Sequence, residues 1–308
     1  MSKFACLAAL AAVLLLSGCS SSGRGSSSVA FKPVDTTASP EVLVANAVES
    51  RASLSSLSGK GVMRIVDTPN RFGLTVNANV VADDTKRMRI RGDKLAGSIQ
   101  AFDIVMLGEE IGFYVPMQKT LYYGKVNELQ NLTFRFDPDE VLRQMLSPDA
   151  SLLLKKWRYV PSENQGRGRP SEIILEEEVP GNRPRMQLAL DSRTGMILSV
   201  SHLDPSGRPF LVKNYGDYRS LDRGKGKRVQ DDFVFPYLMS LSWPRDQRSM
   251  ELHFKAVEGD AIVLEEDFDL ATSDDTRYLP LGEATISPEL SDDPLAVANT
   301  DYSTERPL

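Results

Sequence analysis

The stretch that decides the fold is Phe72-Gly73-Leu74-Thr75-Val76-Asn77-Ala78-Asn79-Val80-Val81. Apolar side chains occupy every second position, and mostly polar or small residues lie between them. Because successive side chains of a strand point to opposite faces, this period of two predicts a β-strand with one buried face. Residues 86–91 repeat the pattern, with Met88 and Ile90 alternating with three arginines. The sequence therefore predicts a fold built mainly on strands.

Turn-forming sequences divide the rest of residues 60–266 into further runs of strand length. Clusters of Asp, Asn, Gly and Pro, such as Pro180-Gly181-Asn182, separate these runs. About fourteen runs qualify, and we expect about ten to twelve of them to be strands. Short turns between successive strands favour an antiparallel meander.

Only two helices are expected in the body of the chain. Ser39-Pro40-Glu41 is a helix start, with an N-cap serine, proline at the first position and an acid in the first turn. That helix should run to about Leu54. A second one should begin at Asp137-Pro138 and end before Ser147-Pro148. With so few helices, the sheet must curl over itself, and we expect a strongly curved, unclosed half-barrel with one or two helices as a lid in its concavity.

The N-terminus has the form of an export signal. Lys3 precedes a thirteen-residue apolar run, Phe4–Leu16, which is too short to span a bilayer and suits a secretory signal. Leu16-Ser17-Gly18-Cys19 resembles the bacterial lipobox, which implies a signal peptide over residues 1–18 and lipidation of Cys19. Ser20, in place of an aspartate, implies delivery to the outer membrane. An ordinary secretory signal with a chance cysteine is the alternative.

Composition divides the remaining chain into three parts. Residues 19–38 are rich in Ser and Gly and are expected to form a flexible tether, and residues 39–271 form the β domain. Residues 272–308 carry eight acidic side chains against two arginines and are expected to be extended or disordered. Most of the net charge of −6 lies in this tail, so the body has no strong field, and we expect no nucleic-acid partner.

Few residues are suited to catalysis or metal binding. The chain has two cysteines, Cys6 in the signal and Cys19, and two histidines, His202 and His253. It lacks the G-x-S-x-G and H-E-x-x-H motifs. We therefore expect no enzyme activity, no cofactor and no metal. A hydrolase built on two carboxylates from distant strands remains an alternative, because such pairs leave no mark in sequence.

Several motifs between the first helix and Gly124 resemble the Lol-type lipoprotein carriers and outer-membrane receptors, LolA and LolB. The matching segments are Leu57-Ser58-Gly59-Lys60-Gly61-Val62, residues 72–80, residues 88–97, Val105-Met106-Leu107-Gly108, Phe113-Tyr114-Val115-Pro116 and Leu121-Tyr122-Tyr123-Gly124. The resemblance covers about a third of the chain. It implies an unclosed barrel with a helical lid, whose hollow receives acyl chains.

The resemblance also implies candidate site residues and partners. Leu95, in the Gly92–Gly97 loop, matches a leucine by which the receptor passes cargo to the membrane, although it could equally fold back onto the sheet edge. The expected partners are lipid or the acyl chains of lipoproteins, the bacterial outer membrane through the N-terminal lipid, and a periplasmic carrier protein. The acyl-chain lining is expected to comprise Phe72, Leu74, Val76, Met88, Ile90, Phe102, Ile104, Phe113, Val115, Val141 and Met145.

Two alternatives stay open at this point. The same apolar stripes suit an ordinary filled core, in which case the sheet could serve a structural or assembly lipoprotein as a protein-docking module without lipid cargo. Arg87, Arg89 and Arg91 share one face and suit either anionic headgroups or a solvated outer surface.

Overall fold

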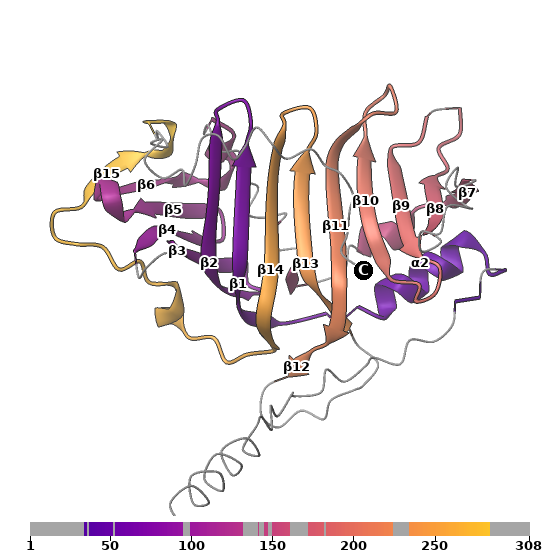
Figure 1. Ribbon diagram of the computed structural model, residues 1–308, viewed down its shortest axis with the longest axis horizontal. Coiled ribbons are helices and arrows are strands. Elements are labelled where there is room, and N and C mark those ends of the chain that lie inside the picture. Colours follow the sequence, from indigo (N-terminus) through magenta and orange to yellow (C-terminus); the bar gives the residue numbers. More distant parts are fainter. Residues whose placement is uncertain are drawn as a thin grey trace, which may run out of the picture.

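A computed structural model describes residues 34–283 except 36, 52, 95–98, 132–140, 142–144, 147–149, 161–171, 182 and 224–233. These residues form one strongly curved sheet (Figure 1). Its strands are β1 (Ser56–Asp67), β2 (Phe72–Asp83), β3 (Arg87–Lys94), β4 (Gln100–Leu107), β5 (Glu110–Val115), β6 (Thr120–Lys125), β7 (Trp157–Val160), β8 (Glu172–Glu177), β9 (Met186–Asp191), β10 (Ile197–Leu203), β11 (Pro209–Ser220), β12 (Asp222–Arg223), β13 (Val234–Trp243), β14 (Arg248–Gly259) and β15 (Arg277–Pro280). The helices are α2 (Pro40–Glu49) and the short 3₁₀ turns η1 (Pro116–Gln118), η2 (Val126–Asn131), η3 (Ala150–Leu154), η4 (Glu265–Phe268) and η5 (Leu281–Glu283).

The strand order confirms the expected fold class. Across the sheet it reads β15-β6-β5-β4-β3-β2-β1-β14-β13-β11-β10-β9-β8-β7, with β12 beside β14. Neighbours pair antiparallel except at β12 and β15, and in the described residues the two ends of the order do not pair, so the barrel stays unclosed. The described strands number fifteen rather than the expected ten to twelve. β12 and β15 are too short to leave a period in the sequence.

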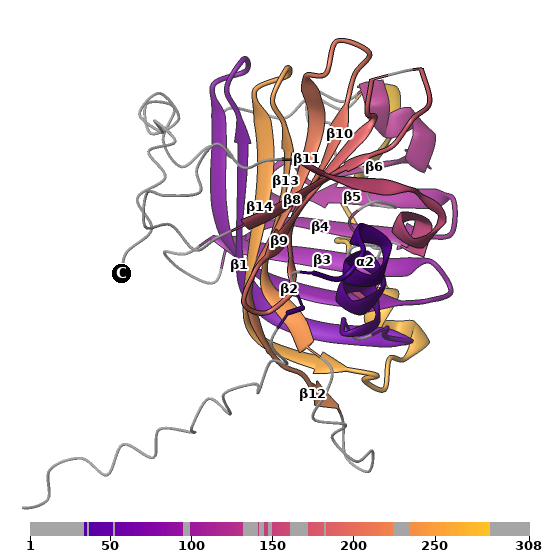
Figure 2. The same cartoon turned by 90° about the vertical axis from the view of Figure 1, so that its right-hand side faces the viewer.

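The helix α2 lies inside the hollow of the curved sheet (Figure 2). The Ser39 hydroxyl accepts a hydrogen bond from the Val42 amide, and Pro40 opens the helix, as the sequence predicts. The helix ends at Glu49, earlier than the expected Leu54, because Arg51 forms a parallel bridge with Val234 instead. Its buried side is made of Leu43, Val44, Ala47 and Val48.

Part of the second expected helix can also be placed. Val141, Met145 and Leu146 are helical and buried in the same apolar cluster as α2. The expected start at Asp137 and end at Ser147 lie outside the described residues. Among the helices of the described part, none is long and apolar enough to cross a membrane.

The chain beyond β14 continues across the outside of the sheet. We call residues 260–283 the strap; in Figure 1 it is the orange-to-yellow segment that runs past β3 toward β6. It contains η4, β15 and η5, and β15 pairs parallel with Thr120–Tyr123 of β6. Leu281 is fully buried, which fixes the strap at its far end. The sheet therefore continues past residue 271, where the sequence analysis ended the β domain, and residues 284–308 lie outside the described part.

Candidate functional site

The concave face of β2–β6 carries a row of apolar side chains in register. Val80 pairs with Ile90, Ile90 with Ile104, and Ile104 with Phe113 on successive strands. Phe113 lies between two other rings, with centroid distances of 6.4 Å to Phe102 and 6.2 Å to Tyr122. The alternation read from the sequence thus becomes one continuous apolar surface.

All eleven residues expected to line an acyl chain lie in this buried cluster. They are Phe72, Leu74, Val76, Met88, Ile90, Phe102, Ile104, Phe113, Val115, Val141 and Met145, and α2 packs against the same cluster. The structure therefore brings together, from four strands and a helical segment, residues that lie up to seventy-three positions apart in the sequence.

The middle of this cluster is filled by the protein's own side chains. Val76, Met88 and Ile90 have 0% exposure, so no water-sized space adjoins them. The space between Val141, Met145 and the strands β13 and β14 is only about 10 Å³, the size of about one water. A guest acyl chain must therefore displace the covering helical segments before it can occupy this part of the concavity.

The interior is rich in methionine. Seven of the ten methionines of the chain belong to the buried cluster: Met63, Met88, Met106, Met145, Met186, Met239 and Met250. Methionine side chains are unbranched and polarisable, and they repack around irregular shapes more readily than branched ones. Such an interior can rearrange around a guest of variable length.

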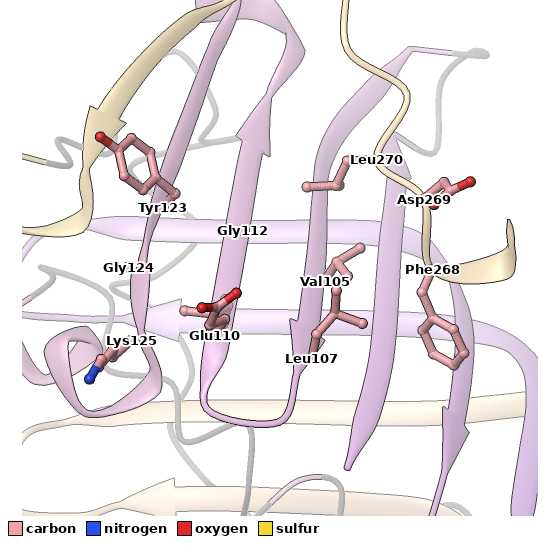
Figure 3. A pocket seen from close by; sticks show the side chains of 11 residues that line it. Val105, Leu107, Glu110, Gly112, Tyr123, Gly124, Lys125, Phe268, Asp269 and Leu270 are labelled. Carbon is pink, nitrogen blue, oxygen red and sulfur yellow. The ribbon is translucent and has the colours of Figure 1, made fainter. Parts of the chain in front are cut away.

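The convex face holds a second site, which the sequence reasoning missed. A groove of about 490 Å³ lies between β4–β6 and the strap (Figure 3). Leu107 and Tyr123 on its walls are about half exposed, at 48% and 50%. Gly112 forms part of the floor, where any Cβ atom would lie 2.8 Å from Cδ1 of Leu270 in the strap. The groove is mainly apolar, with Glu110, Lys125 and Asp269 among its remaining lining residues.

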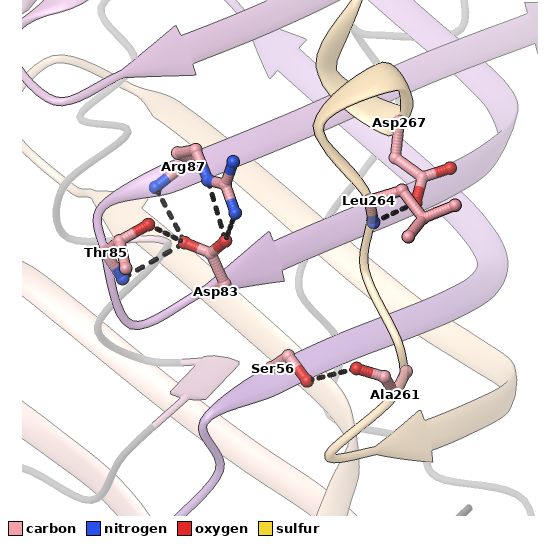
Figure 4. A network of polar contacts seen from close by, with 7 residues as sticks. All are labelled: Ser56, Asp83, Thr85, Arg87, Ala261, Leu264 and Asp267. Atoms are coloured by element: carbon pink, nitrogen blue, oxygen red, sulfur yellow. Dashed lines mark hydrogen bonds and ion pairs between the residues drawn. The ribbon is translucent and has the colours of Figure 1, made fainter.

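Polar contacts fix the strap near its start (Figure 4). The Ser56 hydroxyl of β1 donates to the carbonyl of Ala261 at 2.6 Å, and within the strap itself the Leu264 amide donates to Oδ2 of Asp267 at 2.8 Å. On the neighbouring hairpin, Asp83 accepts bonds from Nε and Nη2 of Arg87 at 2.8 and 2.6 Å. Burial raises the pKa of Asp83, but the hydrogen bonds from Arg87 and from Thr85 outweigh it and leave the pKa below its usual value.

Beneath the strap lies an ion pair that the sequence does not reveal. Arg89 donates from Nε and Nη2 to the two carboxylate oxygens of Asp103, at 2.9 and 2.6 Å. The Asp103 side chain is 1% exposed. The remaining terminal nitrogen of Arg89 donates to the carbonyl of Asp267 in the strap at 3.1 Å. The Arg87 guanidinium lies 4.7 Å from the ring centre of Phe268, which is also buried.

The three arginines of β3 therefore do lie on the outer face, but they are not equally solvated. Arg89 is paired with Asp103 and covered by the strap, and Arg87 is paired with Asp83 and lies over Phe268 of the strap. Only Arg91, beside Asp93, resembles an open surface residue. One feature of the sequence could have indicated that the outer face of β4 is covered. Residues 101–107 are apolar on both faces apart from Asp103, which is typical of a strand buried on both sides.

Two of the candidate site residues lie outside the described residues: Cys19 and Leu95. In the described part of the chain, no three His, Cys, Asp or Glu side chains are grouped so that they could hold a metal ion. His202 lies beside Phe210, and His253 is 3.4 Å from Asp217.

Fold and interior together define a class of protein: an unclosed β half-barrel whose apolar concavity is covered by helical segments. Several solved structures are similar to this chain. A putative outer membrane lipoprotein-sorting protein domain from Vibrio parahaemolyticus is 12% identical, with a TM-score of 0.45, covering 74% of this chain and 95% of that one. A LolA-superfamily protein from Nitrosomonas europaea is 12% identical, with a TM-score of 0.45, covering 76% and 98%.

A DUF1329-family protein from Desulfovibrio piger is 11% identical, with a TM-score of 0.49, over 74% of this chain and 95% of that one. At these identities the similarity concerns the fold. No family model and no curated protein sequence matches the chain.

Proposed function

We propose that this protein is a lipid-anchored lipoprotein that binds acyl chains in the concavity of its half-barrel and assists lipoprotein or lipid transfer or insertion at the bacterial outer membrane, facing the periplasm. Cys19 carries the anchor, and Leu95 touches the membrane during transfer. The protein acts by binding, without catalysis, metal or cofactor. A periplasmic carrier protein delivers the cargo.

The observation that supports this proposal best is the continuous, methionine-rich apolar face beneath α2. Each methylene moved from water into such an environment contributes about 0.8 kcal/mol, so ten methylenes contribute roughly 8 kcal/mol. Displacing α2 would expose Leu43, Val44, Ala47 and Val48. At about 1.5–3 kcal/mol for each of the three larger side chains, that costs about 5–9 kcal/mol. The two amounts are similar, so the affinity for the guest depends on how tightly α2 is docked in the concavity.

This balance also provides for release. A bilayer offers the acyl chain a similar apolar environment, and the return of α2 to the concavity regains the burial of its own side chains. The guest is therefore held against water and yielded to a membrane. No covalent step is required.

The test is a titration of delipidated protein with a fluorescent fatty acid. We expect saturable uptake at a fixed stoichiometry. Val44→Ala, on the buried side of α2, should strengthen uptake about tenfold, because it removes roughly 1.6 kcal/mol of helix docking. Val42→Ala is the matched control, since Val42 is 48% exposed on the same helix. Absence of uptake by all three proteins would refute the proposal.

The convex groove favours a second candidate function, a structural or assembly lipoprotein with a protein-docking sheet and no lipid cargo. Exposed Leu107 and Tyr123 beside the strap are the kind of surface that partner proteins cover. This function would be favoured over the first if the protein captures one stable protein partner and Leu107→Asp abolishes the capture. Mass spectra of the purified complex should then show no lipid.

A further inference from the structure

One corner of the molecule exposes apolar side chains in a fixed position. We define the η3–β7 edge as Leu153, Leu154, Lys156, Arg158 and Tyr159. Leu154 is 88% exposed, and Leu153 and Tyr159 are 46% and 45% exposed. In Figure 1, β7 lies at the opposite end of the sheet from β15 and the strap.

Buried neighbours hold this edge rigid. Leu152 and Trp157 are almost completely buried, and the Trp157 indole donates to the carbonyl of Leu152 at 3.0 Å. The Trp157 amide donates to Glu41 of α2 at 3.2 Å. The two exposed leucines therefore project from a fixed base. Ordering them costs little on contact with a partner, because the backbone is already held.

The flanking charges are nearly balanced. Lys155 pairs with Glu177 at 2.7 Å, and Arg158 pairs with Glu176 at 3.2 Å, while Lys156 is exposed. A strongly cationic surface would bind anionic lipid by charge, but this one offers little net charge. Its apolar side chains must supply most of the affinity. Tyrosine and long cationic side chains are well suited to the boundary between hydrocarbon and water, because each joins an apolar body to a polar end.

The same corner contacts the segment that leads from the N-terminal tether into α2. The Tyr159 hydroxyl donates to the carbonyl of Ala38 at 2.5 Å, directly before α2. Val34, near Gly195, already packs against the apolar core, so the part of the tether expected to be flexible is the fifteen residues from Cys19 to Pro33, with a root-mean-square span of roughly 21 Å. An anchor at Cys19 therefore keeps this corner, which lies only four residues beyond Val34 along the chain, close to the bilayer.

We propose that the η3–β7 edge is a second membrane contact, in which Leu153 and Leu154 insert into the interface of a phospholipid bilayer while Tyr159 and Arg158 lie among the headgroups. The contact rests on the anchoring at Cys19 in the proposed function, and it is independent of acyl-chain uptake. It turns the α2 side of the half-barrel toward the membrane. Cargo released from beneath α2 then has a short path to the bilayer.

The experiment places an environment-sensitive thiol dye at residue 154. The full mature chain carries Cys19→Ser, Leu154→Cys and an N-terminal hexahistidine tag, which leaves one thiol. It is held on vesicles of phosphatidylethanolamine, phosphatidylglycerol and a nickel-chelating lipid, so that the outcome does not depend on native lipidation. The matched control carries Ile262→Cys instead, because Ile262 is 91% exposed but lies in the strap.

We expect a blue shift of the dye at residue 154 and its quenching by brominated lipid, with neither effect at residue 262. Adding Leu153→Asp should reduce the inserted fraction roughly tenfold. Insertion should survive salt of about 1 M, where the screening length is about 3 Å. Equal behaviour of the two dye positions, or loss of insertion in salt, would overturn the proposal. Fatty-acid uptake, measured separately on the same protein, shows whether the acyl-chain function stands or fails on its own.

Discussion

Replacing Asp103 with asparagine should destabilise the protein far more than its position on the outer face of the sheet implies. The change removes the negative charge that Arg89 contacts through two hydrogen bonds of 2.9 and 2.6 Å. Arg89 is 18% exposed and Asp103 is 1% exposed, so the guanidinium loses the carboxylate that it contacts and keeps only the weaker interactions with Asp267 and Asp269 of the strap. Removing one partner of such a buried pair costs about 3–5 kcal/mol.

The expected loss lies at the lower end of that range, about 3 kcal/mol, because part of the Arg89 side chain still reaches water. For a body of this size, each kcal/mol lowers the Tm by about 2–4 °C. Asp103→Asn should therefore lower the Tm by roughly 6–12 °C. Urea unfolding followed by circular dichroism gives the free energy directly.

Two further variants separate the charge effect from general damage. Asp93→Asn is the matched control, because Asp93 pairs with Arg91 on the same strand, but those side chains are 22% and 44% exposed. It should cost less than about 1 kcal/mol. The double variant Arg89→Met with Asp103→Leu removes both charges and should lie within about 1 kcal/mol of the wild type. If Asp103→Asn costs no more than Asp93→Asn, or the double variant is no more stable than Asp103→Asn, the reasoning is refuted.

Three other changes test the sheet, the strap and the titrating groups. Gly61→Ala should lower the free energy of unfolding in urea by at least about 2 kcal/mol, because the new Cβ would lie 2.3 Å from a backbone carbonyl oxygen of β14. Gly216→Ala is the control and should cost under about 1 kcal/mol, because the atom nearest to its Cβ would be 3.5 Å away. Similar losses for both variants would contradict this packing. Phe268→Ala should lower the free energy of unfolding by about 3 kcal/mol and speed proteolytic cleavage of the strap, because it leaves a cavity beneath Arg87. An unchanged cleavage rate would show that other contacts hold the strap. The pKa of Asp83 in the folded protein is below the usual 3.8, so in acid the unfolded chain binds more protons than the folded one, and the stability that Asp83 contributes should be present above pH 3.8 and lost as the pH falls below it. Asp83→Asn should therefore make the urea midpoint fall less steeply with decreasing pH. An unchanged slope would exclude Asp83 as the source of the fall.

The sequence by itself determined the elements and their inward faces. The alternation in residues 72–81 gave β2 with its apolar side toward the concavity, and Ser39-Pro40-Glu41 gave the start of α2. These features are local, since side-chain direction in a strand and capping of a helix depend on residues a few positions apart. The eleven expected lining residues came together for the same reason, because neighbouring antiparallel strands must keep one face apolar.

Only the tertiary structure decided what covers each face. The contact between Arg89 and the carbonyl of Asp267 joins residues 178 positions apart, and the pairing of β15 with β6 is similarly distant. No period or spacing in the sequence marks such contacts, because the path of the chain after β14 depends on the curvature of the whole folded sheet. The packing around Val76, Met88 and Ile90 is likewise invisible in sequence, since filling a concavity depends on the summed volumes of side chains that meet only after folding.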